Sequence, residues 1–104
     1  PLTGQGIVQA LKNGQVGAAN IFSTDPAIAA NGFVALEDTK RLFGSQNIVP
    51  LVRADRAEEV KDTLNAVSAK LTTESIAGML KQTDIDKADP KTVAEEFLKT
   101  NGLG

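Results

Sequence analysis

The hydrophobic pattern of the chain changes near Arg53, and this change constrains the fold more than any other feature. Before it, short runs of small and branched apolar residues alternate with polar turns, a pattern typical of β-strands. After it, apolar residues recur every three or four positions, which is typical of amphipathic helices. The sequence therefore predicts an α/β fold with few strands flanked by helices and a helical C-terminal half.

The first half is expected to hold two short helices and three strands. Residues 4–12 have an apolar face and end at Asn13-Gly14, a left-handed stop. Strands are predicted over residues 15–22, 33–36 and 47–53. Pro50 interrupts the last one and belongs at a strand edge, a bulge or a crossover between domains. Because three strands are few for a sheet that needs helices on both faces, we expect partner strands to be missing.

The second half is expected to form three helices. The first runs from about residue 56 to residue 70, with Asp55 and Glu58 spaced as a capping box. The second begins at Thr72, and the third is opened by Asp89 and the proline that follows it. The apolar faces of the three helices are Val60, Leu64, Val67 and Leu71; then Ile76, Met79 and Leu80; then Val93, Ala94, Phe97 and Leu98.

Charge and composition exclude several functions. The net charge of -2 is spread over interspersed residues of both signs, so neither nucleic acid nor an anionic membrane is an expected partner. The chain has no Cys and no His, which removes thiol nucleophiles, imidazole bases and ordinary zinc ligands. We predict no enzymatic activity, no cofactor and no metal site. The acidic groups at Glu37-Asp38 and at Asp84, Asp86 and Asp89 lack the glycine and terminal Glu of a calcium loop.

The segment from Asn20 to Pro26 is the most informative candidate site. It places two hydroxyls and the carboxylate of Asp25 directly after a predicted buried strand, where α/β proteins bind ligands. The same residues also satisfy a simpler interpretation, a turn followed by a helix cap over Ala27 to Ala30. Phe22 is either a core residue or an aromatic wall beside the loop. Local sequence alone leaves both interpretations open and favours the cap.

Six spaced motifs resemble one known family in the correct order. They are ALKNGQV at 10–16, AANIFSTD at 18–25, VALED at 34–38, LFGSQNIVPLV at 42–52, NAVSAKLT at 65–72 and FLKTNGL at 97–103. Together they resemble the C-terminal part of the osmoprotectant-binding proteins of ABC importers, which take glycine betaine, carnitine, choline or proline. The resemblance covers essentially the whole chain.

The resemblance implies part of a two-lobed type II periplasmic binding protein. Residues 1–46 would end the second lobe and approach the hinge, and residues 47–104 would return to the first lobe. Such proteins bind a small osmolyte in the cleft between the lobes and deliver it, outside the cytoplasm, to an ABC permease in the membrane. The chain begins at Pro1 and has no signal peptide, so we expect it to be processed, excised or incomplete.

The resemblance also assigns ligand-binding positions. Phe22 falls where the family often has an aromatic of a quaternary ammonium cage, and Ser23, Thr24 and Asp25 fall in the loop that faces the cleft. Gln46 and Asn47 lie near the hinge, with Gln46 at a position where many members have Tyr. That departure, and Gly17 where an Asp is common, imply a weaker cage or a ligand other than a betaine.

An alternative hypothesis is an interaction module that binds no ligand of its own. Exposed strand edges and apolar helix faces favour self-association or domain swapping.

Overall fold

The structure is a computed structural model that describes residues 4–44 and 46–104. Ser45, within one of the motifs that carry the resemblance, lies outside the described residues. All the regular structure in the described part is helical. Its elements are α1 (Gln5–Lys12), α2 (Ala27–Ala30), the 3-10 turn η1 (Ala54–Arg56), α3 (Ala57–Ser68), α4 (Thr73–Leu80), the π-helical turn η2 (Lys81–Ile85) and α5 (Pro90–Thr100).

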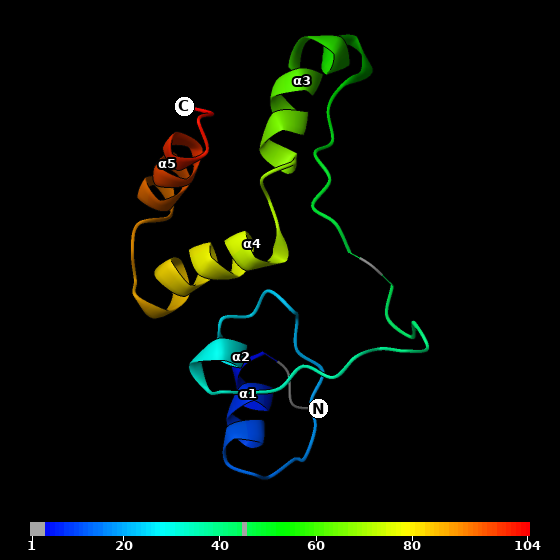
Figure 1. The fold of residues 1–104 in the computed structure, drawn as a ribbon, viewed down its shortest axis with the longest axis vertical. Helices are drawn as coiled ribbons and strands as arrows, with labels where there is room; N and C mark the ends of the chain where they lie inside the picture. Colours follow the sequence, from blue (N-terminus) through cyan, green and yellow to red (C-terminus); the bar gives the residue numbers. More distant parts are fainter. Residues whose placement is uncertain (1–3, 45) are drawn as a thin grey trace.

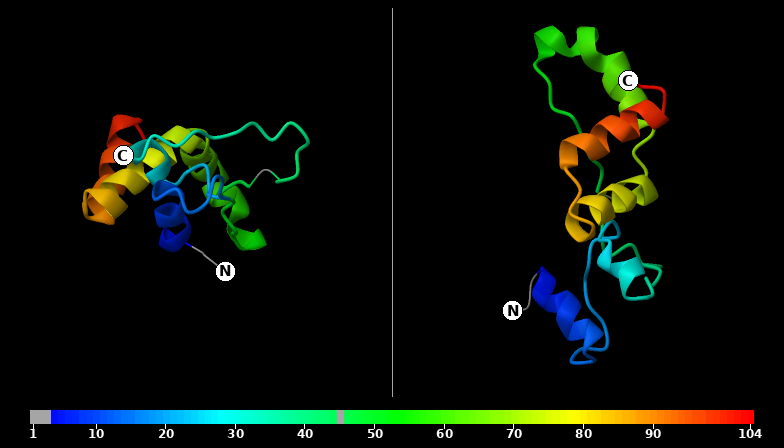
Figure 2. Two further views of the ribbon diagram at one scale, coloured as in Figure 1. Left: turned by 90° about the horizontal axis from the view of Figure 1, so that it is seen from below. Right: turned by 90° about the vertical axis from the view of Figure 1, so that its left-hand side faces the viewer.

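The elements form two groups joined by a long extended connector. Helices α1 and α2 and their loops make the N-terminal group, and α3, α4 and α5 make the C-terminal group (Figure 1). The left-hand view of Figure 2 shows the connector, residues 37–44 and 46–53, looping out to one side of the helices. The radius of gyration is 16.8 Å, whereas a compact domain of about 100 residues has about 13 Å. The chain is therefore more open than a complete globular domain.

The two N-terminal helices end as their sequences predict. Gly14 and Gly32 follow α1 and α2 with φ of 71° and 66°, a left-handed conformation that only glycine adopts without strain. Beyond each glycine the backbone turns back onto the last helical turn. The Gln15 N–H donates to the Ala10 carbonyl at 2.9 Å, and the Phe33 N–H donates to the Ile28 carbonyl at 2.9 Å. These local bonds confirm both predicted helices.

The C-terminal helices α4 and α5 also begin as predicted. Thr72 and Ser75 form a capping box at α4, with Thr72 Oγ1 accepting from the Ser75 N–H at 3.1 Å and Ser75 Oγ accepting from the Thr72 N–H at 2.9 Å. Asp89 caps α5 by accepting from the Thr92 N–H at 3.0 Å. None of the helices in residues 4–44 and 46–104 is long and apolar enough to cross a membrane.

The predicted capping box at the start of α3 is wrong. Asp55 Oδ2 lies 2.8 Å from Nη2 of Arg53, and Glu58 Oε2 lies 2.6 Å from Nζ of Lys61. The turn η1 precedes α3, so Asp55 sits inside that turn and not at the N-cap position. The two carboxylates that the spacing assigned to the helix amides form ion pairs with Arg53 and Lys61 instead.

The three predicted strands are also wrong for this structure. Residues 15–22, 33–36 and 47–53 are extended or turn-like, and no strand occurs among the described residues. A strand is defined by hydrogen bonds to a neighbouring strand, and none of these segments has such a neighbour here. Instead of the predicted α/β fold, the described residues form helices joined by extended segments.

Little of the described chain is buried. Ala10 in α1 is 1% exposed and Val93 in α5 is 5% exposed, and they are the core residues of the described part. Phe97 and Leu98 are half-buried as predicted, but Ala94 is exposed, contrary to its predicted inward position, because no element covers its side of α5. The surface area is 8509 Å², against about 5,600 Å² for a compact monomer of 10.9 kDa.

Candidate functional site

Five of the six residues predicted to bind a ligand line one hollow of about 510 Å³. This hollow, called the α4 hollow below, lies between the loop before α2, the connector and the junction of α3 with α4. Its volume is within the range of small-molecule sites. The lining residues are Phe22, Ser23, Thr24, Gln46, Asn47, Ile48, Ser68, Leu71, Thr73 and Ile76. The structure thus brings together two predicted segments that are far apart in the sequence.

A tight turn positions the first wall, residues 22–24. The Asp25 N–H donates to the Phe22 carbonyl at 2.9 Å, and the Ile28 N–H donates to the Asp25 carbonyl at 3.2 Å. The loop is therefore fixed at both ends, by the turn and by the start of α2. The loop lies beside α4 both in Figure 1 and in the right-hand view of Figure 2.

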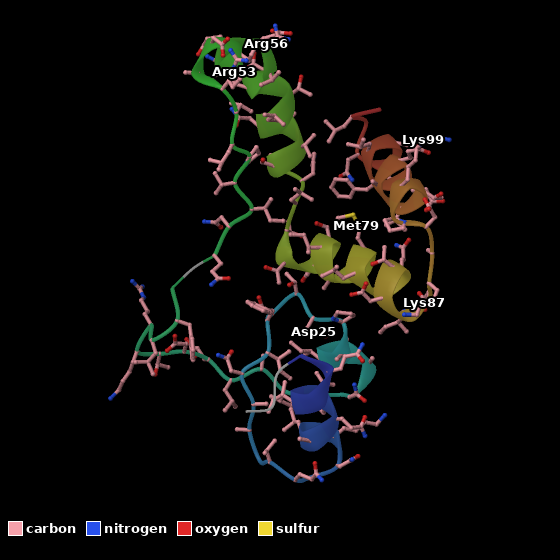
Figure 3. All side chains as sticks on the ribbon, turned by 180° about the vertical axis from the view of Figure 1, so that it is seen from behind. Asp25, Arg53, Arg56, Met79, Lys87 and Lys99 are labelled. Carbon is pink, nitrogen blue, oxygen red and sulfur yellow. The ribbon has the colours of Figure 1, made fainter. Side chains whose placement is uncertain are left out.

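Asp25, the sixth predicted residue, is not part of the lining. Its Oδ1 accepts a hydrogen bond of 2.8 Å from the Ala27 N–H, at the start of α2. Figure 3 labels Asp25 where the loop enters that helix. These contacts are those of a helix cap, the simpler of the two interpretations that the sequence left open. A role for Asp25 in ligand binding stays a prediction.

The polar side chains of the α4 hollow are uncharged and unused. Six of them carry a hydroxyl or an amide, namely Ser23, Thr24, Gln46, Asn47, Ser68 and Thr73. None of the side-chain hydrogen bonds between described residues involves any of these six groups. Hydroxyls and amides can both donate and accept. The hollow therefore offers several neutral groups that are free to form hydrogen bonds with a ligand.

Phe22 supplies the aromatic surface of the α4 hollow. It is 72% exposed, and no other lining residue is aromatic. A ring face attracts an apolar group or a cation that cannot donate a hydrogen bond. One ring gives one wall, which is less than the several faces that enclose a quaternary ammonium group.

The second wall was missed by the sequence analysis. Ser68 ends α3, and Thr73 begins α4, with Leu71 and Ile76 between and beyond them. Leu71 and Ile76 were predicted only as members of apolar helix faces. The available signal was the hydroxyl-rich stretch around the junction, which holds more Ser and Thr residues than one helix start requires. The meeting of this junction with loop 22–24 is a long-range contact that no local pattern encodes.

A larger hollow of about 820 Å³ lies within the N-terminal group. It is lined mainly by small and aliphatic residues of segments 17–21 and 33–36, with Leu11, Ile28 and Phe43. Few of these side chains can form a hydrogen bond. We interpret this hollow as a gap between loosely packed apolar segments, and not as a solute site.

Two residues of the acidic groups weighed as cation sites, Asp38 and Asp86, are engaged in local structure. The Phe43 N–H donates to Oδ2 of Asp38 at 2.9 Å, and this bond, with a second from Leu42, holds the pKa of Asp38 below its ordinary value of 3.8. Asp86 pairs with Lys81 at 2.9 Å. No group of three or more His, Cys, Asp or Glu residues that could hold a metal ion occurs in the part of the chain described.

Comparison with known proteins gives one family and a set of relatives. Residues 2–100 match the family described as the substrate-binding domain of the ABC-type glycine betaine transport system. The carnitine transport binding protein OpuCC of Listeria monocytogenes serotype 1/2a (strain 10403S) is 32% identical over 98 residues. A second Listeria monocytogenes protein of the same name matches to the same extent. No solved structure gives a significant match.

The matches cover most of this chain but only part of each relative. The alignment covers 91% of this chain and 32% of each relative. The chain therefore spans about a third of the length of the curated relatives that it matches.

Proposed function

The chain belongs to the family of substrate-binding domains of ABC-type glycine betaine transport systems, and we propose that it forms part of an extracytoplasmic protein that binds a small osmoprotectant. That protein would deliver the solute to an ABC permease in the membrane. Its family is one of binding and not of catalysis, so the functional step is closure around the solute. The relatives are named for carnitine transport, and a quaternary ammonium or proline-like solute is the class that we propose here.

The α4 hollow is the observation that carries this proposal. Residues Phe22, Ser23, Thr24, Gln46 and Asn47 were assigned to a ligand from sequence, and all five line a single hollow of suitable volume. A single ring and several neutral hydrogen-bonding groups suit a small polar solute that carries a methylated or apolar end.

We propose further that the chain contributes to both lobes of a type II binding protein. Residues 1–46 would end the second lobe and approach the hinge, and residues 47–104 would return to the first lobe. Three observations support this division: the two groups of helices, the extended connector between them and the excess of exposed surface. In the longer protein, strands from the rest of the chain would pair with segments 15–22, 33–36 and 47–53.

Calorimetric titration of the longer protein that carries this sequence tests the binding function. Glycine betaine, carnitine, choline and proline would be titrated in turn, and at least one should bind with a dissociation constant in the micromolar range or below. The isolated chain should show negligible affinity, because it supplies only part of the cleft. Absence of heat with all four solutes would refute the assignment, and micromolar binding by the isolated chain would refute its status as a part.

A matched pair of phenylalanine variants locates the site. Phe22 is 72% exposed and lines the α4 hollow, while Phe43 is 67% exposed and lines the larger one. Phe22→Ala should weaken binding of the preferred solute about tenfold, in line with the loss of a desolvated cation-π contact. Phe43→Ala should leave the affinity within about twofold. Equal losses in the two variants would contradict the placement of the site.

Self-association is the second candidate, and the exposed apolar residues of the extended segments favour it for the isolated chain. Val34, Leu36 and Leu51 are 83%, 84% and 94% exposed. Unpaired edges with such side chains are templates for pairing with another copy. Light scattering should then show oligomers for the isolated chain and a monomer for the longer protein. A monomeric isolated chain at high concentration would rule out the interaction module.

A further inference from the structure

The second wall of the α4 hollow, at the junction of α3 and α4, contains two hydroxyls that form no hydrogen bond with another described residue. Four hydroxyl residues lie close together at the junction of α3 and α4, namely Ser68, Thr72, Thr73 and Ser75. Thr72 and Ser75 cap α4 by bonding to each other's backbone N–H groups, at 3.1 and 2.9 Å. Ser75 Oγ also lies 3.1 Å from the Lys70 carbonyl oxygen. The demands of the helix start are thus met without Ser68 and Thr73.

Ser68 and Thr73 both line the hollow instead. Neither side chain takes part in a hydrogen bond with another described residue. A hydroxyl on a lining residue that bonds to none of the described residues can donate its proton to a ligand.

The wall formed by loop 22–24 shows the same division between residues that hold a helix and residues that line the hollow. Asp25 bonds to the Ala27 N–H at 2.8 Å and so holds the start of α2, while Ser23 and Thr24 line the hollow. The loop wall also carries Phe22, the single aromatic residue of the lining. The two walls therefore differ in one respect that matters for orientation: the ring is on the loop, and the α3–α4 wall has hydroxyls and aliphatic groups.

This difference assigns an orientation to a zwitterionic solute. A quaternary ammonium group has no hydrogen to donate and gains most from a ring face, so it belongs against Phe22. A carboxylate accepts hydrogen bonds and gains most from hydroxyl donors, because bonds to an ionised acceptor are about twice as strong as neutral ones. Two sides of the hollow lack a ring: the connector, with the amides of Gln46 and Asn47, and the α3–α4 wall, with the hydroxyls of Ser68 and Thr73. We assign the carboxylate to the α3–α4 wall, and variants of its two hydroxyls test that choice.

We infer that Ser68 and Thr73 donate hydrogen bonds to the carboxylate of a zwitterionic solute whose cationic end faces Phe22. The inference rests on the proposed binding function and adds two specificity-determining residues to it. It requires that the α3–α4 wall distinguish solutes with a carboxylate from those without one.

The test measures two affinities on the longer protein that carries this sequence. Carnitine and glycine betaine have a carboxylate, and choline has a quaternary ammonium group without one. The double variant Ser68→Ala/Thr73→Val should weaken the binding of carnitine and glycine betaine at least tenfold. Choline affinity, measured by competition where it is weak, should change by less than about twofold, since its cationic end keeps the ring.

Two further variants keep the result interpretable. Thr63→Val alters an exposed hydroxyl on α3 outside the lining and should change neither affinity. Thr73→Ser retains the hydroxyl and, combined with native Ser68, should keep the zwitterion affinity within about twofold of the parent. Circular dichroism of each variant checks that the helices are unchanged.

Equal losses for choline and the zwitterions, or no loss for either, would overturn the inference while leaving solute binding itself established. Failure of the parent protein to bind any of the three solutes would overturn the proposed function, and the inference with it. The two failures are therefore distinguishable in one set of titrations.

Discussion

Residues 4–53 of this chain are richer in apolar residues than residues 54–104 but contain less regular structure. The C-terminal half folds into three α-helices joined by short turns, and α4 and α5 begin with side-chain caps. Among its described residues the N-terminal half has α1 and the short helix α2, and the other described residues are extended or turn-like. Most of the strongly exposed apolar side chains belong to this half, Leu51 being the extreme at 94%.

The difference follows from where the hydrogen bonds of each element come from. A helix closes its backbone bonds within four residues, so α5 needs only its own sequence and its cap at Asp89. A strand takes its bonds from another segment, and residues 47–53 have none beside them. The comparison teaches that elements with local hydrogen bonds form in this chain, whereas segments that would need hydrogen bonds from a distant strand stay extended.

Leu51→Ala should give the largest change in the free energy of unfolding, and we expect that change only in the longer protein. In the isolated chain Leu51 is 94% exposed, so Leu51→Ala should change the free energy of unfolding by less than about 0.5 kcal/mol. In the longer protein we expect this residue to be covered by partner strands, and the same change should cost about 3 kcal/mol. Urea unfolding followed by circular dichroism measures both values.

Ile85→Ala is the matched control for Leu51. Ile85 lies in η2 and is 44% exposed, on an element that is complete without partner strands. Its substitution should cost similar amounts in the isolated chain and in the longer protein. A small effect of Leu51→Ala in both contexts would break the comparison, because it would mean that segment 47–53 remains unpaired in the whole protein.

The same distinction explains which elements the sequence could predict. The starts of α4 and α5 were predicted because Thr72 and Asp89 act on amides three residues away. The box at Asp55 failed because the turn η1 precedes α3, so Asp55 does not occupy the N-cap position and its carboxylate pairs with Arg53 instead. The strands failed because their pattern describes a surface to be covered, and the covering segments are not beside them.

The candidate site divides in the same way. Loop 22–24 was predicted from its polar residues after an apolar run, and Gln46 and Asn47 were added by family resemblance. The structure gathers all of these around one hollow. The hydroxyl-rich junction was a sequence signal for the second wall, but nothing local distinguishes Ser68 and Thr73 from the neighbouring hydroxyls that cap α4. Only the three-dimensional arrangement separates the hydroxyls that hold a helix from those that face the hollow.

Removal of the α5 cap should produce an intermediate effect that is the same in both contexts. Asp89→Ala takes away the acceptor of the Thr92 N–H and should cost about 1 kcal/mol. Asp62→Ala, at an exposed position in α3, should cost less than about 0.5 kcal/mol. Thermal unfolding monitored at the helical band measures both variants. A cost for Asp89→Ala that appears only in the longer protein would show that α5 also depends on distant partners.

The smallest effect is expected from acidification of the connector turn at Asp38. The Phe43 N–H donates to its carboxylate at 2.9 Å and, with the Leu42 bond, lowers the pKa of Asp38 from 3.8. A carboxylate with a lowered folded-state pKa stabilises the turn fully above the unfolded-state pKa, and this contribution is lost as the pH falls through the folded-state value. The turn should therefore loosen only below about pH 4.

Nuclear magnetic resonance can follow this loss at one residue. The amide signal of Phe43 should shift with the same midpoint as the Asp38 carboxyl signal, and the Asp38→Asn variant should abolish that shift. Because Asp38 is fully exposed and its partners lie within five residues, the midpoint should be the same in the isolated chain and in the longer protein. A midpoint that moves between the two would place this turn among the elements that need distant partners, and so extend the dependent part of the chain beyond its apolar segments.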